Sequence, residues 1–137
     1  STENWKRSPD AVRFLGFKKQ NELPPCYDLA DVFVLPSGQE AWGLVVNEVM
    51  CAGKAVICSD SIGAAPDLAK PGENGAIFRT DDVKDLARAL ADVLRDESRL
   101  AAMGRRSFEM ISNWGYREDV AGLRAALAAV CPGRIVA

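Results

Sequence analysis

The sequence predicts an α/β domain, in which helices cover a parallel β-sheet and the final third is helical. Over residues 12–78, short apolar runs alternate with longer stretches of helical periodicity, which is the pattern of strands joined by helices. After Phe78 only helical periodicity remains. The 137 residues suit one domain, and no linker rich in glycine, proline or serine divides them.

Four strands are predicted, because four apolar runs are short and bounded by turn residues such as Gly16 and Pro36. Two of them are rich in β-branched or aromatic residues, and the other two follow connections that contain glycine. The predicted strands are residues 12–15, 31–35, 55–58 and 76–78.

Two helices are predicted between these strands. The first would have Asn21 as its N-cap and begin late, because Pro24 and Pro25 are tolerated only in a first turn. The second, over residues 44–52, is apolar on nearly every side, so we expect it to be buried between the sheet and its neighbours.

Three more helices are predicted in the final third. The first opens at Asp81 or Asp82 and carries an apolar stripe that we expect to face the core. The second is interrupted near Gly104, and the third ends before Pro132. Their apolar positions are Val83, Leu86, Leu90, Val93 and Leu94 in the first, Leu100, Met103, Phe108 and Ile111 in the second, and Val120, Leu123, Leu127 and Val130 in the third.

Composition excludes several classes of function. Seventeen basic residues against nineteen acidic ones, a net charge of −2, provide no broad positive field for nucleic acid. Without histidine or a CxxC pair, no metal site is expected. Cys26, Cys51 and Cys58 lie in apolar segments, which favours buried thiols and a reducing cytoplasm. No apolar run approaches the roughly 20 residues of a membrane span, so we expect membrane contact to be peripheral at most.

The loop 37–43, between the second predicted strand and the helix at 44–52, is the candidate ligand site. In open α/β sheets, ligands bind outside the carboxyl ends of the strands. Ser37, Gly38 and Gly43 permit close backbone approach, and a helix that begins near Gly43 or Leu44 would direct unpaired amides at an anion. Such loops are common, and a plain structural turn is the better interpretation of the loop alone.

Two glutamates flank the start of this helix. Glu48 lies in an otherwise apolar helix and needs partners, because an unpaired buried carboxylate costs several kcal/mol or shifts its pKa. It lies roughly 6–8 Å from the helix start, about the separation of a diphosphate from its ribose hydroxyls. Glu40 precedes the helix and would project toward a group beyond the phosphate. Taken singly, each is better explained as an exposed acid, Glu40 near a helix N-terminus and Glu48 at the helix edge.

The combination resembles the nucleotide-sugar-binding domain of the family-4 glycosyltransferases. Glu40 and Glu48 match the two glutamates of that family, with seven residues between them, after a strand that ends in Pro-Ser. Further segments match family motifs in order and spacing: residues 12–17, 30–33, 72–78 and 113–114.

This resemblance implies the distal part of the C-terminal, Rossmann-like domain of a GT-B fold over residues 1–137. The acceptor-binding N-terminal domain, and the cations that neutralise the diphosphate, would lie outside this chain. The implied reaction is retaining sugar transfer from a nucleoside diphosphate sugar, without a metal or further cofactor. Departures are Trp42 in place of phenylalanine or tyrosine, Gly63-Ala64 in place of two glycines, Asp67 in place of glutamate, and Ala55 in place of proline.

The resemblance also assigns roles. Glu40 would contact the transferring sugar as the catalytic residue, and Glu48 would bind the ribose. The amides of Trp42, Gly43 and Leu44 would hold the distal phosphate.

Two further residues complete the expected substrate-binding set. Ser37 opens the loop, and Phe17 follows a turn that lies near the base in such enzymes; simple core packing is the alternative for Phe17.

A second hypothesis is a non-catalytic module that binds a nucleotide sugar or a partner protein. A partner chain could supply the missing half, and an exposed sheet edge would favour self-association. A dinucleotide oxidoreductase is set aside because no strand is followed by G-x-G-x-x-G. We expect the isolated chain to bind nucleotide weakly and to transfer no sugar.

Overall fold

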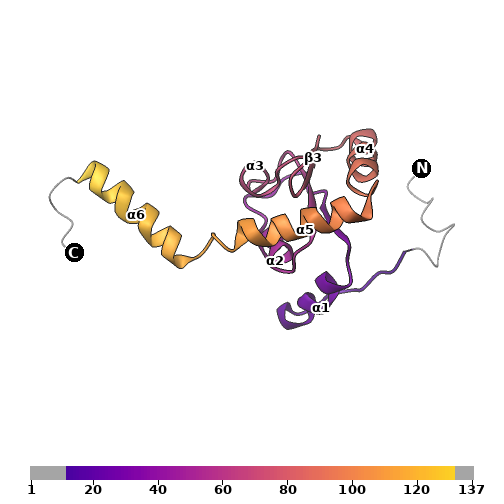
Figure 1. Ribbon diagram of the computed structural model, residues 1–137, viewed down its shortest axis with the longest axis horizontal. Helices are drawn as coiled ribbons and strands as arrows, with labels where there is room; N and C mark the ends of the chain where they lie inside the picture. Colours follow the sequence, from indigo (N-terminus) through magenta and orange to yellow (C-terminus); the bar gives the residue numbers. More distant parts are fainter. Residues whose placement is uncertain (1–11, 132–137) are drawn as a thin grey trace.

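The computed structural model describes residues 12–131, which form a three-stranded parallel sheet with helices packed around it (Figure 1). The strands are β1 (Val32–Leu35), β2 (Ala55–Ser59) and β3 (Gly75–Phe78), in that spatial order. Helical connections join them, as parallel strands require. The predicted α/β class, with a Rossmann-like parallel sheet and flanking helices, is confirmed.

The fourth predicted strand, residues 12–15, is wrong. These residues have no strand structure, and their chain runs away from the sheet toward the first helix (Figure 1). Phe14 is 76% exposed there. A strand forms only beside a hydrogen-bonding neighbour, and β1 is the edge of the described sheet. An apolar run can therefore have the pattern of a strand without pairing with a described strand.

Six α-helices and a short 3₁₀ turn are present between residues 12 and 131. Their bounds are η2 (Gln20–Glu22), α1 (Leu23–Asp28), α2 (Leu44–Cys51), α3 (Ala65–Leu68), α4 (Val83–Val93), α5 (Glu97–Ile111) and α6 (Tyr116–Val130).

Helix starts differ from the prediction in one place and agree in another. Lys19, and not Asn21, precedes the first turn, because residues 20–22 form a 3₁₀ turn before α1. Asp82 caps α4 by accepting from the amides of Lys84 and Asp85, so the second of the two predicted capping residues is confirmed. Helix α3 was not predicted, since four residues carry no periodicity.

Helix α5 is continuous through Gly104, so the predicted interruption is wrong. Glycine is needed at this position because α5 packs closely on the turn at Gly53. A Cβ on Gly104 would overlap the carbonyl oxygen of Gly53. Gly104 therefore marks a close helix contact, and a helix tolerates one glycine at about 1 kcal/mol.

Strand β2 divides the core into two layers, because its side chains alternate between the faces of the sheet. Val56 and Cys58 pack on the layer of α2 and α3 with Val46, Val49, Met50, Ile62 and Leu68. Ala55 and Ile57 pack on the layer of α4 and the first half of α5 with Phe78, Ala89, Val93 and Met103.

Part of the expected core face of α4 is exposed. Val83, 79% exposed, and Leu94 lie at the two ends of the stripe and are exposed to solvent. Leu86 and Leu90 pack against the core beside Val93, so the middle of the stripe behaves as predicted.

Helix α6 projects away from the rest of the molecule (Figure 1). None of its residues is buried, although its periodicity was predicted correctly. Its larger side chains are all exposed: Tyr116, Val120, Leu123, Leu127 and Val130. Among the described residues, no helix is long and apolar enough to cross a membrane.

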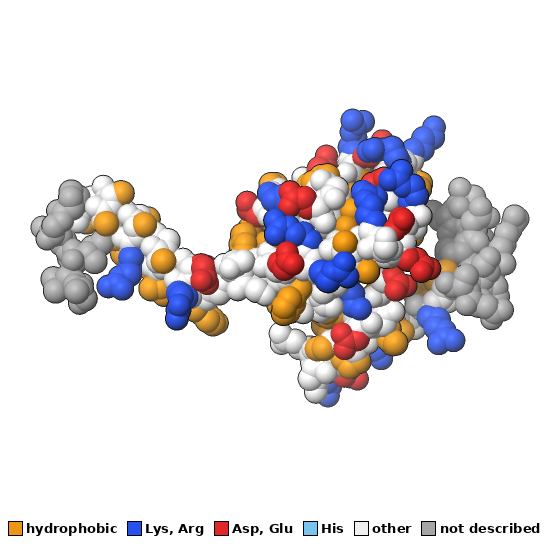
Figure 2. Space-filling view, viewed as in Figure 1, with side chains coloured by type: hydrophobic (Ala, Val, Ile, Leu, Met, Phe, Trp, Pro, Cys, Tyr) orange, Lys and Arg blue, Asp and Glu red, His pale blue; other side chains and the backbone are white. Residues whose placement is uncertain are grey.

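Charges of both signs are interspersed on the face shown in Figure 2. Among the described residues several charges are paired, as in the Arg106–Glu73 contact of 3.1 Å and the Arg88–Asp85 contact of 2.5 Å. Such pairing weakens any single positive field, as expected for a chain with nearly balanced charges.

Candidate functional site

The loop 37–43 leaves β1 at the carboxyl edge of the sheet, where two serines from the end of β2 hold its start. The hydroxyls of Ser59 and Ser61 donate to the carbonyl oxygen of Ser37 over 2.6 and 2.9 Å. The Thr80 hydroxyl donates in turn to Ser61 over 2.9 Å. Ser37 thus anchors the loop through its backbone.

The far end of the loop pairs with the segment after β2. The amide of Gly63 donates to the carbonyl oxygen of Glu40 over 3.0 Å, and the amide of Ala64 donates to that of Trp42 over 2.9 Å. A Cβ at Gly63 would overlap the carbonyl oxygen of Ala41, so only glycine fits without a shift of the loop. The loop is therefore a fixed part of the sheet edge.

Helix α2 begins directly after this loop. Gly43 has φ 94°, a left-handed conformation in which glycine is favoured, and packs closely on Ile62. The first helical bond runs from the amide of Val46 to the carbonyl oxygen of Gly43, over 2.9 Å. The amides of Leu44 and Val45 therefore precede the helical hydrogen bonds, at the positive end of the helix dipole.

Trp42 is held by its side chain. Its indole Nε1 donates to Asn47 Oδ1 over 3.1 Å, and its ring lies 5.9 Å from that of Trp114, which follows α5. These contacts occupy the side chain, and the carbonyl oxygen of Trp42 accepts from Ala64. Leu44, expected to be buried with the rest of its helix, is 70% exposed, so the prediction that α2 is buried all round is wrong at that position.

Glu48 lies one turn further along α2 and is half-buried. Its Oε2 accepts a hydrogen bond of 2.8 Å from the hydroxyl of Tyr27 in α1. Burial and this bond raise the pKa of Tyr27 to about 12. The sequence predicted that Glu48 needs a partner, but not that Tyr27 provides one, since no local signal joins residues 21 positions apart.

A cavity of about 470 Å³ opens beside Glu48. Its lining comes from η2, α1 and α2 and consists of Gln20, Pro24, Tyr27, Asp28, Glu48, Cys51 and Ala52. Most of the exposed lining surface is apolar, with carboxylate, amide and phenol groups at its border. This composition suits a flat organic group with a few hydroxyls.

The other predicted site residues lie further apart. Glu40 is exposed on the loop, where its backbone forms an isolated parallel β-bridge with Ile62. Phe17 is 91% exposed and does not line the Glu48 cavity, so core packing does not explain it. The structure thus places the loop and the helix start at the carboxyl edge of the sheet and Glu48 one turn along the same helix, and it leaves Phe17 outside the Glu48 cavity.

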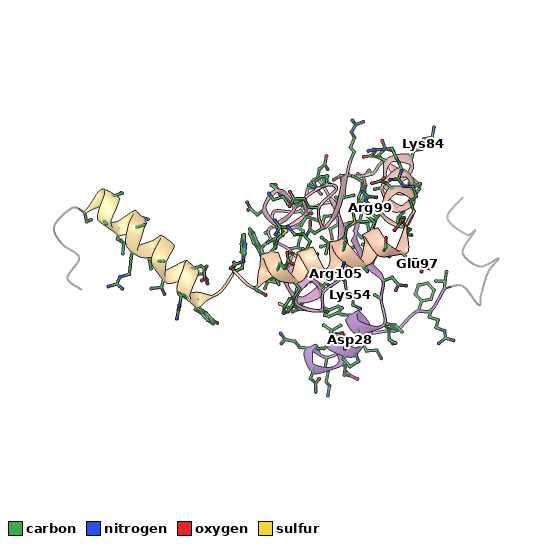
Figure 3. All side chains as sticks on the ribbon, viewed as in Figure 1. Asp28, Lys54, Lys84, Glu97, Arg99 and Arg105 are labelled. Carbon is green, nitrogen blue, oxygen red and sulfur yellow. The ribbon has the colours of Figure 1, made fainter. Side chains whose placement is uncertain are left out.

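A larger cavity, about 590 Å³, lies at the amino end of the strands, next to the end of α2. It is lined by residues before β1 and β2 and at the α4–α5 junction, including Asp31, Lys54 and Glu97. The Lys54 ammonium donates to the carbonyl oxygen of Asp28, a residue of the Glu48 cavity, over 2.9 Å; Figure 3 labels Lys54, Asp28 and Glu97. Because this is the amino end of the strands, it is the less suitable place for a nucleotide.

The cysteines differ from the expectation of buried thiols. Cys58 is buried in β2, and burial raises its pKa to about 11. Cys51 is exposed on the outer face of α2, and Cys26 is half-buried. Between residues 12 and 131, no group of three or more cysteine, aspartate or glutamate side chains could hold a metal ion.

A parallel sheet with a fixed loop, a helix N-terminus and a carboxylate at its carboxyl edge is typical of the nucleotide-binding class of α/β domains. The comparisons with known proteins give the family. The chain belongs to the glycosyl transferases group 1, whose family model matches residues 5–110.

Among curated relatives, a D-inositol 3-phosphate glycosyltransferase of Corynebacterium aurimucosum is 32% identical over 105 residues, covering 77% of this chain and 25% of that protein. The sulfoquinovosyl transferase SQD2 of Arabidopsis thaliana is 32% identical over 114 residues, covering 81% of this chain and 22% of that protein. The chain thus spans about a quarter of the length of these relatives.

Solved structures share the fold. The sucrose-phosphate synthase of Thermosynechococcus elongatus matches with a TM-score of 0.77 and 28% identity, over 94% of this chain and 32% of that one. The HepE protein of Anabaena, solved in complex with UDP and glucose, matches with a TM-score of 0.72 and 24% identity, over 94% of this chain and 34% of that one. The GT-B architecture of these neighbours supports the predicted fold.

Proposed function

We propose that this chain is the donor-binding part of a retaining, family-4-type glycosyltransferase that uses a nucleoside diphosphate sugar. One observation carries the proposal: the free amides at the start of α2 lie at the carboxyl edge of the sheet, and Glu48, one turn along the same helix, lines a cavity of about 470 Å³.

The spacing of these groups suits a nucleoside diphosphate. A phosphate is held by the amides of Leu44 and Val45, together with those of Trp42 and Gly43 that the resemblance also assigned to it, since unpaired amides and the helix dipole both favour an anion. Glu48 lies about 6 Å further along the axis, at 1.5 Å per residue, and accepts from the ribose hydroxyls. The cavity beside Glu48 receives the nucleoside. Phe17 does not line this cavity and would contact the base only if parts of the protein outside the described residues bring it closer.

Glu40 faces the other side of the phosphate. It lies on the loop before the helix, exposed, while its backbone is held by Gly63. A carboxylate in this position accepts hydrogen bonds from the hydroxyls of the transferring sugar. Ser37 contributes by fixing the start of the same loop.

Retention follows if the leaving phosphate assists the incoming hydroxyl, so that stabilising charge on the diphosphate matters more than a side-chain base. No lysine or arginine lines the Glu48 cavity among the residues described. The relatives are about four times longer than the matched region, so the counter-charge and the acceptor surface come from other parts of the protein.

UDP is the first nucleotide to test, because HepE was solved with UDP, with UDP and glucose, and with UDP-glucose. The base, sugar and acceptor of this protein are to be identified with a panel of uridine, guanosine and adenosine diphosphate sugars.

A non-catalytic binding module is the second candidate. The exposed apolar residues of α6 favour it, since a helix with this surface packs against something outside the described chain. A module of this kind binds nucleotide in the same way but releases no product. Turnover by the full-length protein separates the two.

The experiment compares Glu40→Ala with Glu48→Gln in the full-length protein. Glu40→Ala is expected to lower turnover strongly while nucleoside diphosphate affinity stays within twofold, because its contacts form around the transferring sugar. Glu48→Gln is expected to weaken nucleotide binding roughly tenfold or more, at about 1.5–3 kcal/mol for hydrogen bonds to a charged acceptor. Calorimetry and release of nucleoside diphosphate are the readouts.

Equal losses of affinity and turnover in Glu40→Ala would refute the division of roles. Unchanged affinity in Glu48→Gln would remove the ribose assignment and leave the fold and the family as they are.

A further inference from the structure

Between residues 12 and 131, Tyr27 is the one side chain that hydrogen-bonds to the carboxylate of Glu48. Its hydroxyl donates to Glu48 Oε2 over 2.8 Å, from α1 to α2, and both residues line the same cavity of about 470 Å³. The contact therefore lies inside the proposed nucleoside site and not on the outer surface of the helices.

Tyr27 is itself firmly placed. Its side chain is 9% exposed, and its ring lies edge-on to Phe33 of β1, with 6.5 Å between centroids and 82° between planes. The sheet thus fixes the ring, and the ring fixes the hydroxyl. An edge-to-face pair of this geometry favours one ring orientation over others.

The hydroxyl constrains the carboxylate. A glutamate on a helix samples several rotamers, and ordering it on binding costs free energy. A donor on Oε2 selects one of these rotamers and leaves Oε1 for other donors. The phenol is protonated and donates at physiological pH, and burial and Glu48 raise its pKa further, to about 12.

We propose that Tyr27 is a positioning residue that orients Glu48 toward the ribose hydroxyls and thereby sets the preference for ribonucleotides. The inference rests on the proposed function, in which Glu48 binds the ribose, and it extends that function by one residue. Tyr27 does not touch the reacting atoms.

The competing explanation is that the Tyr27–Glu48 hydrogen bond only links α1 to α2. Such a link affects stability and the binding of all ligands alike, whereas a positioning residue affects only the binding of ligands that carry the ribose hydroxyls. A nucleotide that lacks these hydroxyls separates the two explanations within a single variant.

The experiment measures binding of UDP and of 2′,3′-dideoxyuridine diphosphate by calorimetry to the full-length protein. If the unmodified protein prefers another base, the guanosine or adenosine pair takes their place. The variants are Tyr27→Phe, Glu48→Gln and both together. Tyr116→Phe, which removes the other tyrosine hydroxyl of the chain from exposed α6, is the matched control.

Tyr27→Phe is expected to weaken binding of the ribonucleotide about fivefold, the effect of one hydrogen bond, and to leave the dideoxy analogue within twofold. The double variant is expected to match Glu48→Gln alone, because Tyr27 acts only through Glu48. Tyr116→Phe is expected to bind both nucleotides as the unmodified protein does.

The inference would be overturned if Tyr27→Phe weakened the binding of both nucleotides equally. It would also be overturned if Tyr27→Phe weakened the binding of neither nucleotide while Glu48→Gln abolished the ribose preference. In both cases the proposed function stands. If Glu48→Gln leaves the ribose preference intact, or no nucleoside diphosphate binds, the ribose assignment fails and the inference fails with it.

Discussion

Single residues fix the shape of the site loop. The amide of Gly63 holds Glu40 from one side, and the left-handed Gly43 turns the chain into α2 on the other. Between them the backbone of Trp42 bonds to Ala64. Glu40 and the start of α2 therefore share one rigid frame.

Gly63→Ala tests this frame. Its Cβ would overlap the carbonyl oxygen of Ala41, so the loop must shift, and we expect a loss of about 1–3 kcal/mol in the free energy of unfolding, with weaker nucleoside diphosphate binding. Gly38→Ala, where no atom lies within 4 Å of the new Cβ, is the control for stability. Urea unfolding measures both variants. A Gly63→Ala protein as stable as the control would show that the loop is not held by this contact.

At the same scale, residue types predicted part of the site. Glu48 was singled out because a carboxylate in an apolar helix needs a partner, and its hydrogen bond satisfies that need. Tyr27 could not be predicted, since the pairing depends on how α1 packs on α2. Cys51 was expected inside but is exposed, because apolar neighbours do not settle which side of a helix faces solvent.

Among the described helices, α5 is the one that contributes buried side chains to both core layers. Its first half contributes Met103 to one core cluster, and its end contributes Ile111 to the other. Gly104 lies between these positions, against the turn that enters β2. The close approach of α5 to Gly53 is what allows both contacts.

Gly104→Ala is therefore expected to destabilise the protein, although alanine is the better helix former by about 1 kcal/mol. Overlap with Gly53 forces the helix outward, at a cost of about 1–3 kcal/mol. Gly122→Ala, also within a helix but with open space around it, is expected to be neutral or stabilising. Thermal unfolding compares the two. A stabilised Gly104→Ala protein would contradict the close contact.

The periodicity of the sequence predicted which segments are helices and which are strands, but it did not predict what each element packs against. Strands β1 to β3 were each predicted, and the register between them comes from the pairing seen in the fold. Residues 12–15 have a strand pattern without a described neighbour, and α6 has a core-like stripe without a described core. Both patterns are local, but strand pairing and burial depend on what lies beside the element.

For the whole molecule, the central claim is that the carboxyl edge of the sheet binds the nucleotide. The larger of the two cavities lies at the amino end of the strands, and the smaller one is lined by Glu48 and by Cys51 and Ala52 at the end of α2. The choice of the smaller cavity rests on the free amides of α2, on Glu48 and on the rule that open α/β sheets bind ligands at their carboxyl ends.

Hydrogen exchange of the full-length protein, followed by mass spectrometry with and without saturating nucleoside diphosphate, tests this choice most directly. The account predicts that the nucleotide slows exchange at residues 42–48, where unpaired amides meet the phosphate, and leaves residues 94–101 unchanged. Slower exchange at residues 94–101 with no change at 42–48 would place the nucleotide in the cavity bordered by Lys54 and Glu97 and contradict the account.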